Sequence, residues 1–191
     1  MNPSVASRRR QQRVELIARR AALTSAERKK AADDVAEKLD RLVDELGSTV
    51  IGLYWPIKNE LNLIHWARAL ARRTGAVLCL PVVVAPKSPL EYWRWAPGEA
   101  MQAGIWDIAT PARREVCSPD LMLAPLVGFD AGNYRLGYGG GYFDRTLAIR
   151  PAFAVGVGYD FCGLETIFPQ PHDVPMHAIL TECREIRPSR G

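Results

Sequence analysis

The sequence has few of the residues that build metal clusters and disulfide frameworks. Its 191 residues include four cysteines and three histidines, and no two cysteines form a C-x-x-C pair. Such widely spaced cysteines exclude a zinc knuckle and the disulfide scaffold of a small secreted domain. We therefore predict that the cysteines are reduced and mainly structural.

Long hydrophobic runs are also missing. No apolar stretch approaches the ~20 residues of a membrane-spanning helix, and the basic N-terminal region lacks the hydrophobic segment of a secretory signal. The sequence thus predicts a cytoplasmic protein without a membrane partner. With 48% hydrophobic residues and no linker or repeat, it also predicts one domain spanning 1–191.

The common nucleotide-binding and hydrolase motifs are absent as well. The chain has no Gly-Lys followed by Ser or Thr, as a Walker loop requires, and no G-x-S-x-G elbow. It has instead a stretch from Arg135 to Arg145 that places four glycines between two arginines and includes Asp144. Glycine amides, arginines and a carboxylate suit a nucleotide phosphate with its metal. Glycine clusters are equally typical of tight turns, so the spacing alone leaves both interpretations open.

Hydrophobic periodicity predicts alternating helices and strands. Val14, Ile17, Ala18 and Ala21 predict a buried helix face over about 7–22. A T-S-A-E capping box at 24–27 opens a second helix, which a glycine at position 47 ends. The other predicted elements are strands at 49–55, 76–80, 90–95, 120–126 and 153–159, and helices at about 61–73 and 140–149.

This order of elements predicts the fold class. We expect an α/β protein, a single-domain three-layer α/β/α arrangement with a mainly parallel, Rossmann-like sheet. The glycine-rich stretch then falls where a strand meets a helix. Ligands of open α/β sheets bind beyond the carboxyl ends of the strands, so the placement favours a ligand loop.

Positive charge is concentrated near the N-terminus. Residues 8–30 hold nine arginines and lysines and two glutamates, a net charge of +7 by count, whereas the whole chain carries +4. Such a segment is typical of a solvated helix face, and it can also bind nucleic-acid phosphates. No interleaved aromatic platform accompanies it, so a nucleic-acid partner is not expected. An RNA-associated protein that uses this helix stays an alternative.

Further motifs accompany the glycine stretch in a fixed order. They are Y-W-P at 54–56 before Glu60, G-F-D at 128–130, G-N-Y at 132–134 and H-D-V-P at 172–175. In order and spacing they resemble the 5-formyltetrahydrofolate cyclo-ligase family, also called methenyltetrahydrofolate synthetases, over nearly the whole chain. The resemblance implies an ATP- and Mg²⁺-dependent ligase. It would cyclise 5-formyltetrahydrofolate to 5,10-methenyltetrahydrofolate and release ADP and phosphate.

The resemblance also implies which residues bind ATP and its metal. Arg9 and Arg13 of the first helix would contact ATP, while Asp144 and Asp173 would hold Mg²⁺, which prefers one or two carboxylates plus phosphate oxygens. The glycine segment would wrap the phosphates. Its residues are Arg135, Leu136, Gly137, Tyr138, Gly139, Gly140, Gly141, Tyr142 and Phe143.

At the folate end, the resemblance places Glu60 against the pterin ring, with Trp55 beside it. Tyr138 and Tyr142 would line the folate side. Arg145 and Tyr142 are the predicted catalytic residues, because phosphoryl transfer depends on positioning and on stabilising charge. No protein nucleophile is required.

Four positions depart from the family's usual pattern. Arg9 stands where lysine is more frequent, and Thr110, Cys162 and Gln170 replace residues near the substrate end. Arginine keeps the charge of lysine but presents a planar fork instead of a point charge. These departures leave a second alternative open, a nucleotide- or folate-binding module with little turnover.

A metal-binding alternative comes from the histidines. His172, Asp173 and His177 form an H-D-x-x-x-H cluster that could bind a transition metal, although no cysteine completes the site. The expected partners therefore remain ATP and 5-formyltetrahydrofolate, bound by a monomer.

Overall fold

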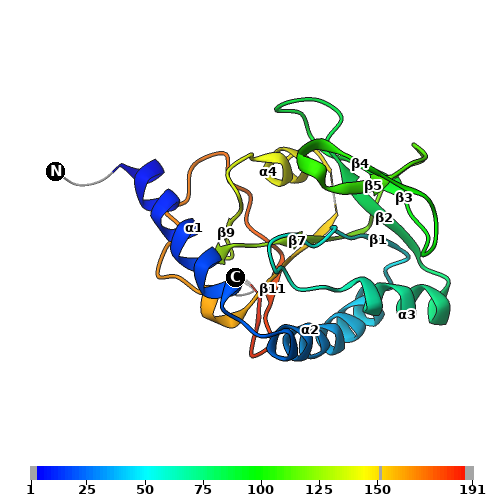
Figure 1. The fold of residues 1–191 in the computed structure, drawn as a ribbon, viewed down its shortest axis with the longest axis horizontal. Coiled ribbons are helices and arrows are strands. Elements are labelled where there is room, and N and C mark those ends of the chain that lie inside the picture. The colour runs from blue at the N-terminus through cyan, green and yellow to red at the C-terminus, as the bar shows by residue number, and fades with distance from the viewer. Residues whose placement is uncertain (1–3, 151, 188–191) are drawn as a thin grey trace.

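The structure is a computed structural model that describes residues 4–150 and 152–187. An eight-stranded sheet forms its centre (Figure 1). Helices α2 (Ser25–Leu46) and α3 (Ile64–Thr74) cover one face, and the short α4 (Tyr142–Leu147) lies on the other. This arrangement confirms the predicted α/β class with its mainly parallel sheet.

Five strands of the central sheet run parallel to one another. They are β1 (Val50–Gly52), β2 (Val77–Val82), β7 (Leu121–Pro125), β10 (Phe153–Val157) and β11 (Ala178–Leu180). In space their order is β2-β1-β7-β10-β11, so the winding direction reverses between β1 and β7. At such a switch point the segments leaving the two strands diverge and open a crevice for a ligand.

Three strands near the edges each pair antiparallel with a neighbour, and the strand predicted at 90–95 is one of them. β3 (Glu91–Arg94) pairs antiparallel with β2, and β6 (Val116–Cys117) pairs antiparallel with β3. At the other edge, β12 (Glu185–Ile186) pairs with β11. Residues 83–90 are too few for the crossover helix that a parallel β2–β3 pair would need.

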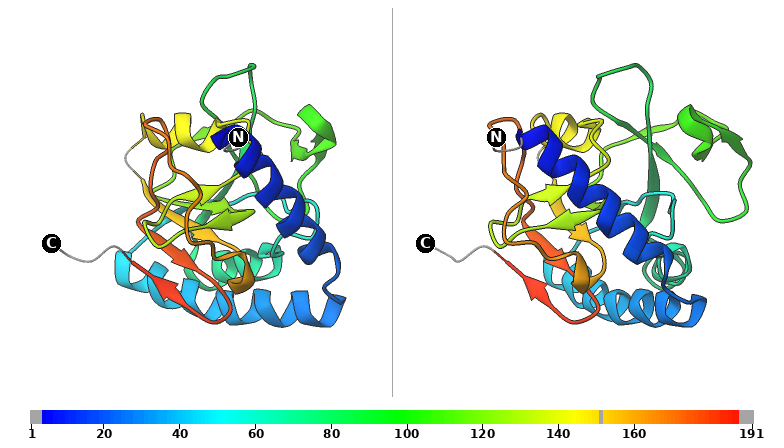
Figure 2. Two further views of the ribbon diagram at one scale, coloured as in Figure 1. Left: turned by 90° about the vertical axis from the view of Figure 1, so that its left-hand side faces the viewer. Right: turned by 60° about the vertical axis from the view of Figure 1, so that its left-hand side comes forward.

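Two small hairpins stand outside the central sheet. β4 (Met101–Ala103) and β5 (Ala109–Pro111) flank a 3₁₀ turn at Ile105–Asp107, and this hairpin projects from the body (Figure 2). β8 (Gly128–Phe129) pairs with β9 (Arg135–Leu136). The strand before the glycine segment therefore belongs to a hairpin and not to the sheet. A second 3₁₀ turn spans Asp160–Cys162.

Helix α1 (Val5–Ala21) forms where predicted, but it buries a different face. Val14 is 64% exposed and Ala18 and Ala21 are exposed, whereas Leu16 and Arg20 are buried. The prediction of this face was wrong because α1 packs beside the β8–β9 hairpin, where arginine side chains make many of its contacts. Figure 2 shows α1 running across this side of the molecule.

Helix α2 begins and ends at the predicted signals. The Thr24 hydroxyl accepts the Glu27 amide at 3.2 Å, and the Glu27 carboxylate accepts the Thr24 amide at 2.7 Å. Gly47, at φ 62°, ends the helix in the left-handed conformation. The buried stripe of α2 packs into the main core, and it consists of Ala31, Ala32, Val35, Leu39, Leu42 and Val43.

Two further features of the structure concern the cysteines and the length of the apolar helices. All four cysteines are free, with Cys79 and Cys162 buried and Cys183 exposed. Within the described part of the chain, no helix combines the length and the apolar character needed to cross a bilayer.

Candidate active site

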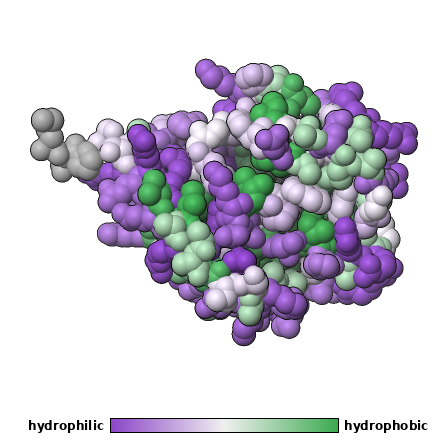
Figure 3. Space-filling model, viewed as in Figure 1, coloured by the Kyte–Doolittle hydropathy of each residue, from purple (hydrophilic) through white to green (hydrophobic). Residues whose placement is uncertain are grey.

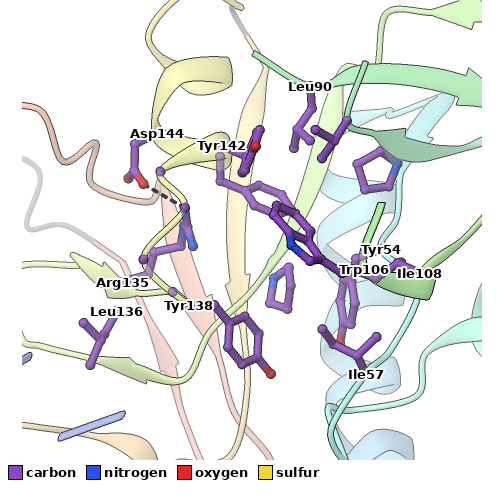
Figure 4. Close-up of a pocket in the computed structure, with 18 of the residues that line it drawn as sticks. Tyr54, Ile57, Leu90, Trp106, Ile108, Arg135, Leu136, Tyr138, Tyr142 and Asp144 are labelled. Carbon is purple, nitrogen blue, oxygen red and sulfur yellow. Dashed lines mark hydrogen bonds and ion pairs between the residues drawn. The ribbon is translucent and has the colours of Figure 1, made fainter. Parts of the chain in front are cut away.

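A cavity of about 670 Å³ opens at the carboxyl ends of the central strands. Tyr54 and Trp55 follow β1, Pro81 lies in β2 and Pro125 ends β7, and all four line the cavity. The glycine segment and the start of α4 form the facing wall (Figure 4). In Figure 3, which has the same view as Figure 1, hydrophobic side chains reach the surface in the middle of the molecule, between α1 and the β4–β5 hairpin. The cavity therefore occupies the crevice expected at the switch point.

The G-F-D and G-N-Y motifs build the hairpin that delivers Arg135. Asp130 is 5% exposed, and its carboxylate accepts the amides of Gly132 at 3.0 Å, Tyr134 at 3.2 Å and Ile167 at 3.1 Å. Asn133 takes φ 62° in the turn, a conformation that asparagine tolerates. These motif residues are structural, since their bonds fix the direction in which β9 enters the cavity wall.

The glycine segment is held from both sides by arginines. Arg13 donates from Nε to the Gly137 carbonyl at 2.7 Å, and Arg145 donates to the Gly140 carbonyl at 2.5 Å. Gly139 at φ 98° and Gly141 at φ 66° take left-handed conformations. The sequence needs glycine at these two positions because other residues rarely adopt them.

Replacing Gly139 with alanine is expected to weaken nucleotide binding. The strain of a left-handed alanine costs about 1–3 kcal/mol, and the new Cβ would lie 3.5 Å from the Arg13 guanidinium. Gly98→Ala is the matched control, because Gly98 has nearly the same φ, 96°, in a turn with no atom within 4 Å of an added Cβ. Isothermal titration with ATP should show a loss of affinity in Gly139→Ala alone. Equal affinity in the two variants would contradict a role of this segment in ATP binding.

Two ion pairs occupy the charged end of the cavity. Arg135 donates to the Asp144 carboxylate at 3.0 Å, with side-chain exposures of 5% and 14% (Figure 4). Arg9 pairs with Asp173, and its Nε donates to the Ile167 carbonyl at 2.9 Å. The other Asp144 oxygen accepts the Val174 amide at 3.4 Å, which ties α4 to the segment carrying Asp173. The structure thus brings the two predicted metal ligands to one end of the cavity.

The pKa shifts at this end follow from burial and from these pairs. Burial lowers the pKa of Arg135, while the charge of Asp144 opposes that shift. Burial would raise the pKa of Asp173, but hydrogen bonds from Arg9 and from the Gln170 amide lower it below its ordinary value. The pKa of Arg13 is lowered by burial and by the like charge of Arg9. Such crowding of cations is suited to an anionic ligand.

Glu60 lies at the opposite end and is held by a tight turn. Its amide donates to the Ile57 carbonyl and its carboxylate Oε2 accepts the Ile57 amide, both at 2.9 Å. Lys58 and Asn59, at the two central positions, have φ of 46° and 58°, as in a type I′ turn. The carboxylate is buried, with 6% of the residue exposed, and its Oε1 finds no hydrogen-bond partner among the described residues. Burial raises the pKa of Glu60.

Aromatic rings line the space between the two ends. Trp106 and Tyr142 meet edge to face at 5.6 Å, and Trp55 meets Trp95 in the same way at 6.1 Å. Trp106 lines the cavity and is 65% exposed, whereas Trp93 and Trp95 are buried. Figure 4 shows the rings of Tyr138, Tyr142 and Trp106 around one space. Flat hydrophobic walls of this kind suit a planar ring system.

The predicted site residues converge on this cavity, with one exception. Arg145 lies outside the cavity wall: its guanidinium bonds the Gly140 and Ser88 carbonyls and stacks on Tyr142 at 4.9 Å. Its catalytic role stays a prediction. Those that line the cavity are Arg9, Arg13, Trp55, Glu60, Arg135, Leu136, Gly137, Tyr138, Gly139, Gly140, Gly141, Tyr142, Phe143, Asp144 and Asp173.

Sequence reasoning missed Arg20, the buried arginine of α1, and Tyr54. Arg20 follows the buried Leu16 by one helical turn, but the face predicted from Val14 and Ile17 hid that spacing. Among the departures from the family pattern, Thr110 lines the cavity, whereas Cys162 is buried outside its wall.

The histidine cluster does not form a metal centre. The Nδ1 atom of His177 accepts the Ala154 amide at 2.9 Å, and its ring stacks on Phe153 at 4.9 Å. The side chain of His172 is 77% exposed. Within residues 4–150 and 152–187, no group of three or more His, Cys, Asp or Glu side chains is arranged to hold a metal ion. The structure therefore gives the transition-metal alternative no support.

Fold and site together define a class of protein. A doubly wound α/β sheet carries at its switch point a cavity with cations and carboxylates at one end and aromatic rings with a buried glutamate at the other. A sequence profile of the 5-formyltetrahydrofolate cyclo-ligase family matches residues 5–182. The chain belongs to this family and is an enzyme of the ligase class.

Individual relatives agree with the family match. The chain is 30% identical to a 5-formyltetrahydrofolate cyclo-ligase of Haemophilus influenzae over 91% of its length and 97% of the relative's. It is 29% identical to the protein of that name from Mycolicibacterium smegmatis, over 92% and 94%. The solved structure of Aquifex aeolicus 5,10-methenyltetrahydrofolate synthetase aligns with a TM-score of 0.83 at 28% identity, covering 96% of this chain and 94% of that one.

Proposed function

We propose that this protein catalyses the ATP- and Mg²⁺-dependent cyclisation of 5-formyltetrahydrofolate to 5,10-methenyltetrahydrofolate, with release of ADP and phosphate. One observation carries the proposal: a single cavity joins the arginine, carboxylate and glycine end to the Glu60 and aromatic end. A triphosphate and a planar pterin can therefore meet in it. Family membership supports the same reaction.

At the charged end, Arg9, Arg13 and the glycine segment would hold the phosphates. Arg13 and Arg145 fix the segment through the carbonyls of Gly137 and Gly140, so its backbone is already ordered before a ligand arrives. A preordered site for a polyanion contributes to catalysis because little reorganisation accompanies charge transfer. With ATP bound, Arg9 would exchange its bond to Asp173 for bonds to the phosphates, which would leave the Asp173 carboxylate available to hold Mg²⁺.

The carboxylates fit the divalent ion that accompanies ATP. Mg²⁺ is usually held by one or two carboxylates with phosphate oxygens and waters, and not by an all-protein cage. Asp144 and Asp173 would form such a pair, since Val174, the residue after Asp173, donates its amide to Asp144. When bound there, Mg²⁺ would supply charge neutralisation to the transferring phosphoryl group.

In the proposed reaction the formyl oxygen attacks the γ-phosphorus and ADP leaves. N10 then attacks the activated formyl carbon, the carbon–oxygen bond breaks, and the oxygen departs with the phosphate. N10 loses its proton in closing the ring. Phosphorylation makes a poor leaving oxygen a good one, so the protein's task is to hold the two substrates in line.

The other residues would position the folate and exclude water. Glu60 would accept hydrogen bonds from the pterin N–H groups, which gives its unpartnered Oε1 atom a partner. Trp55, Tyr138 and Tyr142 would pack on the ring, and the exposed Trp106 would cover it from the β4–β5 hairpin. Covering the site limits hydrolysis of the phosphorylated intermediate.

The test is the near-ultraviolet absorbance of the methenyl product. Purified protein mixed with 5-formyltetrahydrofolate should give a rise in absorbance that requires both ATP and Mg²⁺. A flat trace together with ATP binding would contradict the proposed reaction and favour the binding-module alternative. Steeply salt-dependent RNA binding that survives Asp144→Asn would favour the RNA alternative.

A further inference from the structure

Arg20 is a buried cation for which the proposed reaction gives no role. It lies on α1 with 2% of its surface exposed. No carboxylate in the described part of the chain lies within salt-bridge distance of its guanidinium. Burying an arginine without a direct counterion is costly. An arginine at this depth therefore directs attention to the groups that it contacts.

The contacts of Arg20 lead to the folate end of the cavity. One terminal nitrogen donates to the Tyr138 hydroxyl at 2.5 Å, and the other donates to the Leu126 carbonyl at 3.4 Å. Because the Tyr138 oxygen accepts from Arg20, its own proton is left to donate toward Glu60, with which the hydroxyl interacts. Tyr138 lines the cavity and is 39% exposed, and Figure 4 shows its ring there.

The second group that Arg20 influences is Glu60. Burial raises the pKa of this carboxyl, and the Ile57 amide and the positive charge of Arg20 are the two largest opposing influences. Tyr138, Lys58 and Tyr54 also face it. Arg20 thus favours the ionised Glu60, which is able to accept hydrogen bonds on both oxygens.

We propose that Arg20 is a positioning residue for the folate ring, which acts through Tyr138 and Glu60. It orients the Tyr138 hydroxyl as a donor toward Glu60 at the cavity wall and provides the positive charge beside which Glu60 stays an acceptor. Arg20 itself does not line the cavity. This inference rests on the proposed function, since it assigns the ring of 5-formyltetrahydrofolate to this end.

The test compares Arg20→Met with Arg19→Met. Arg19 is the neighbouring arginine on the same helix, but it points to Phe161, whose ring lies 4.7 Å from its guanidinium. In Arg20→Met the Kd for 5-formyltetrahydrofolate, followed by quenching of tryptophan fluorescence, should rise about tenfold or more, as expected when a buried polar contact is lost. The Kd for ATP should change less than about twofold, within the scatter of distant substitutions. Arg19→Met should resemble the wild type for both ligands.

The pH dependence separates positioning from a purely structural role. Without the cation, the pKa of Glu60 should rise. Folate binding needs the ionised carboxylate, so as the pH is lowered it should be lost at a higher pH than in the wild type. Arg20→Lys keeps the charge without the fork, and it should restore the wild-type pH limit while folate binding stays weaker. Equal losses for ATP and folate, or an unmoved pH limit, would overturn the inference.

Tyr138→Phe removes the hydroxyl that Arg20 bonds, and it leaves the Arg20 side chain unchanged. Tyr138 is partly exposed, so this variant should fold even where Arg20→Met does not. It should weaken folate binding, and adding Arg20→Met should cost less than the sum of the single effects. Additive effects would overturn the inference. Failure of the proposed function would look different, since the wild type itself would form no methenyl product.

Discussion

Replacing Asp144 with asparagine is expected to reduce turnover by at least about a hundredfold. The substitution keeps the size of the side chain and removes the negative charge that we assign to Mg²⁺. It also leaves Arg135, 5% exposed at its side chain, without its paired charge. Breaking a buried pair in this way costs about 3–5 kcal/mol. The melting temperature should therefore fall together with the activity.

The two effects of Asp144→Asn can be separated experimentally. Methenyl formation should be measured over a range of Mg²⁺ concentrations, well below the melting temperature, with circular dichroism as a check on folding. Asp40→Asn is a control for loss of an ion-paired aspartate, because Asp40 pairs with Arg73 at 2.7 Å outside the cavity. Full turnover in a folded Asp144→Asn protein would refute the metal assignment, whereas recovery at high Mg²⁺ would support it.

Replacing Glu60 with glutamine is expected to lower kcat/KM for 5-formyltetrahydrofolate by at least about a hundredfold. The amide has the same shape, but half of it donates hydrogen bonds where the pterin also offers donors. The KM for ATP should stay unchanged, because Glu60 is hydrogen-bonded to Ile57, which lies away from Asp144 (Figure 4). Steady-state kinetics with each substrate varied in turn measures this difference.

Glu99→Gln is the matched control for this substitution. Glu99 closes a similar turn, in which its carboxylate accepts the Ala96 amide at 2.8 Å and its amide donates to the Ala96 carbonyl at 3.1 Å. That turn is exposed and outside the cavity. The control should keep wild-type kinetics. An equal loss in both variants, or none in Glu60→Gln, would count against Glu60 as the pterin residue.

The same substitution should make the protein more stable at neutral pH. The pKa of Glu60 is higher in the folded than in the unfolded protein because of burial. Such a carboxyl reduces stability as the pH rises from its unfolded pKa through its folded pKa, since the unfolded state releases the proton first. Glu60→Gln removes this penalty. Its melting temperature should exceed that of the wild type at pH 8, and the difference should vanish toward pH 4. A difference that does not depend on pH would contradict the raised pKa.

The sequence by itself determined the features that local signals encode. The capping box at Thr24 and the glycine at position 47 set the ends of α2, because their bonds join residues within one or two turns. The alternation of helices and apolar strands predicted the α/β class, and ordered motifs indicated the family. The residues around the cavity could be named from the sequence because the order and spacing of the motifs resemble those of the family.

The tertiary structure decided which distant groups meet. Arg9 pairs with Asp173 and Arg20 reaches Tyr138, although 164 and 118 positions separate them. These contacts depend on the strand order β2-β1-β7-β10-β11 and on the path of α1 beside the β8–β9 hairpin. Periodicity reports which residues share a helix face, but the neighbour that covers that face decides whether it is apolar. For α1 that neighbour is the β8–β9 hairpin with the Tyr138 hydroxyl beyond it, and so the helix buries an arginine where apolar side chains were predicted.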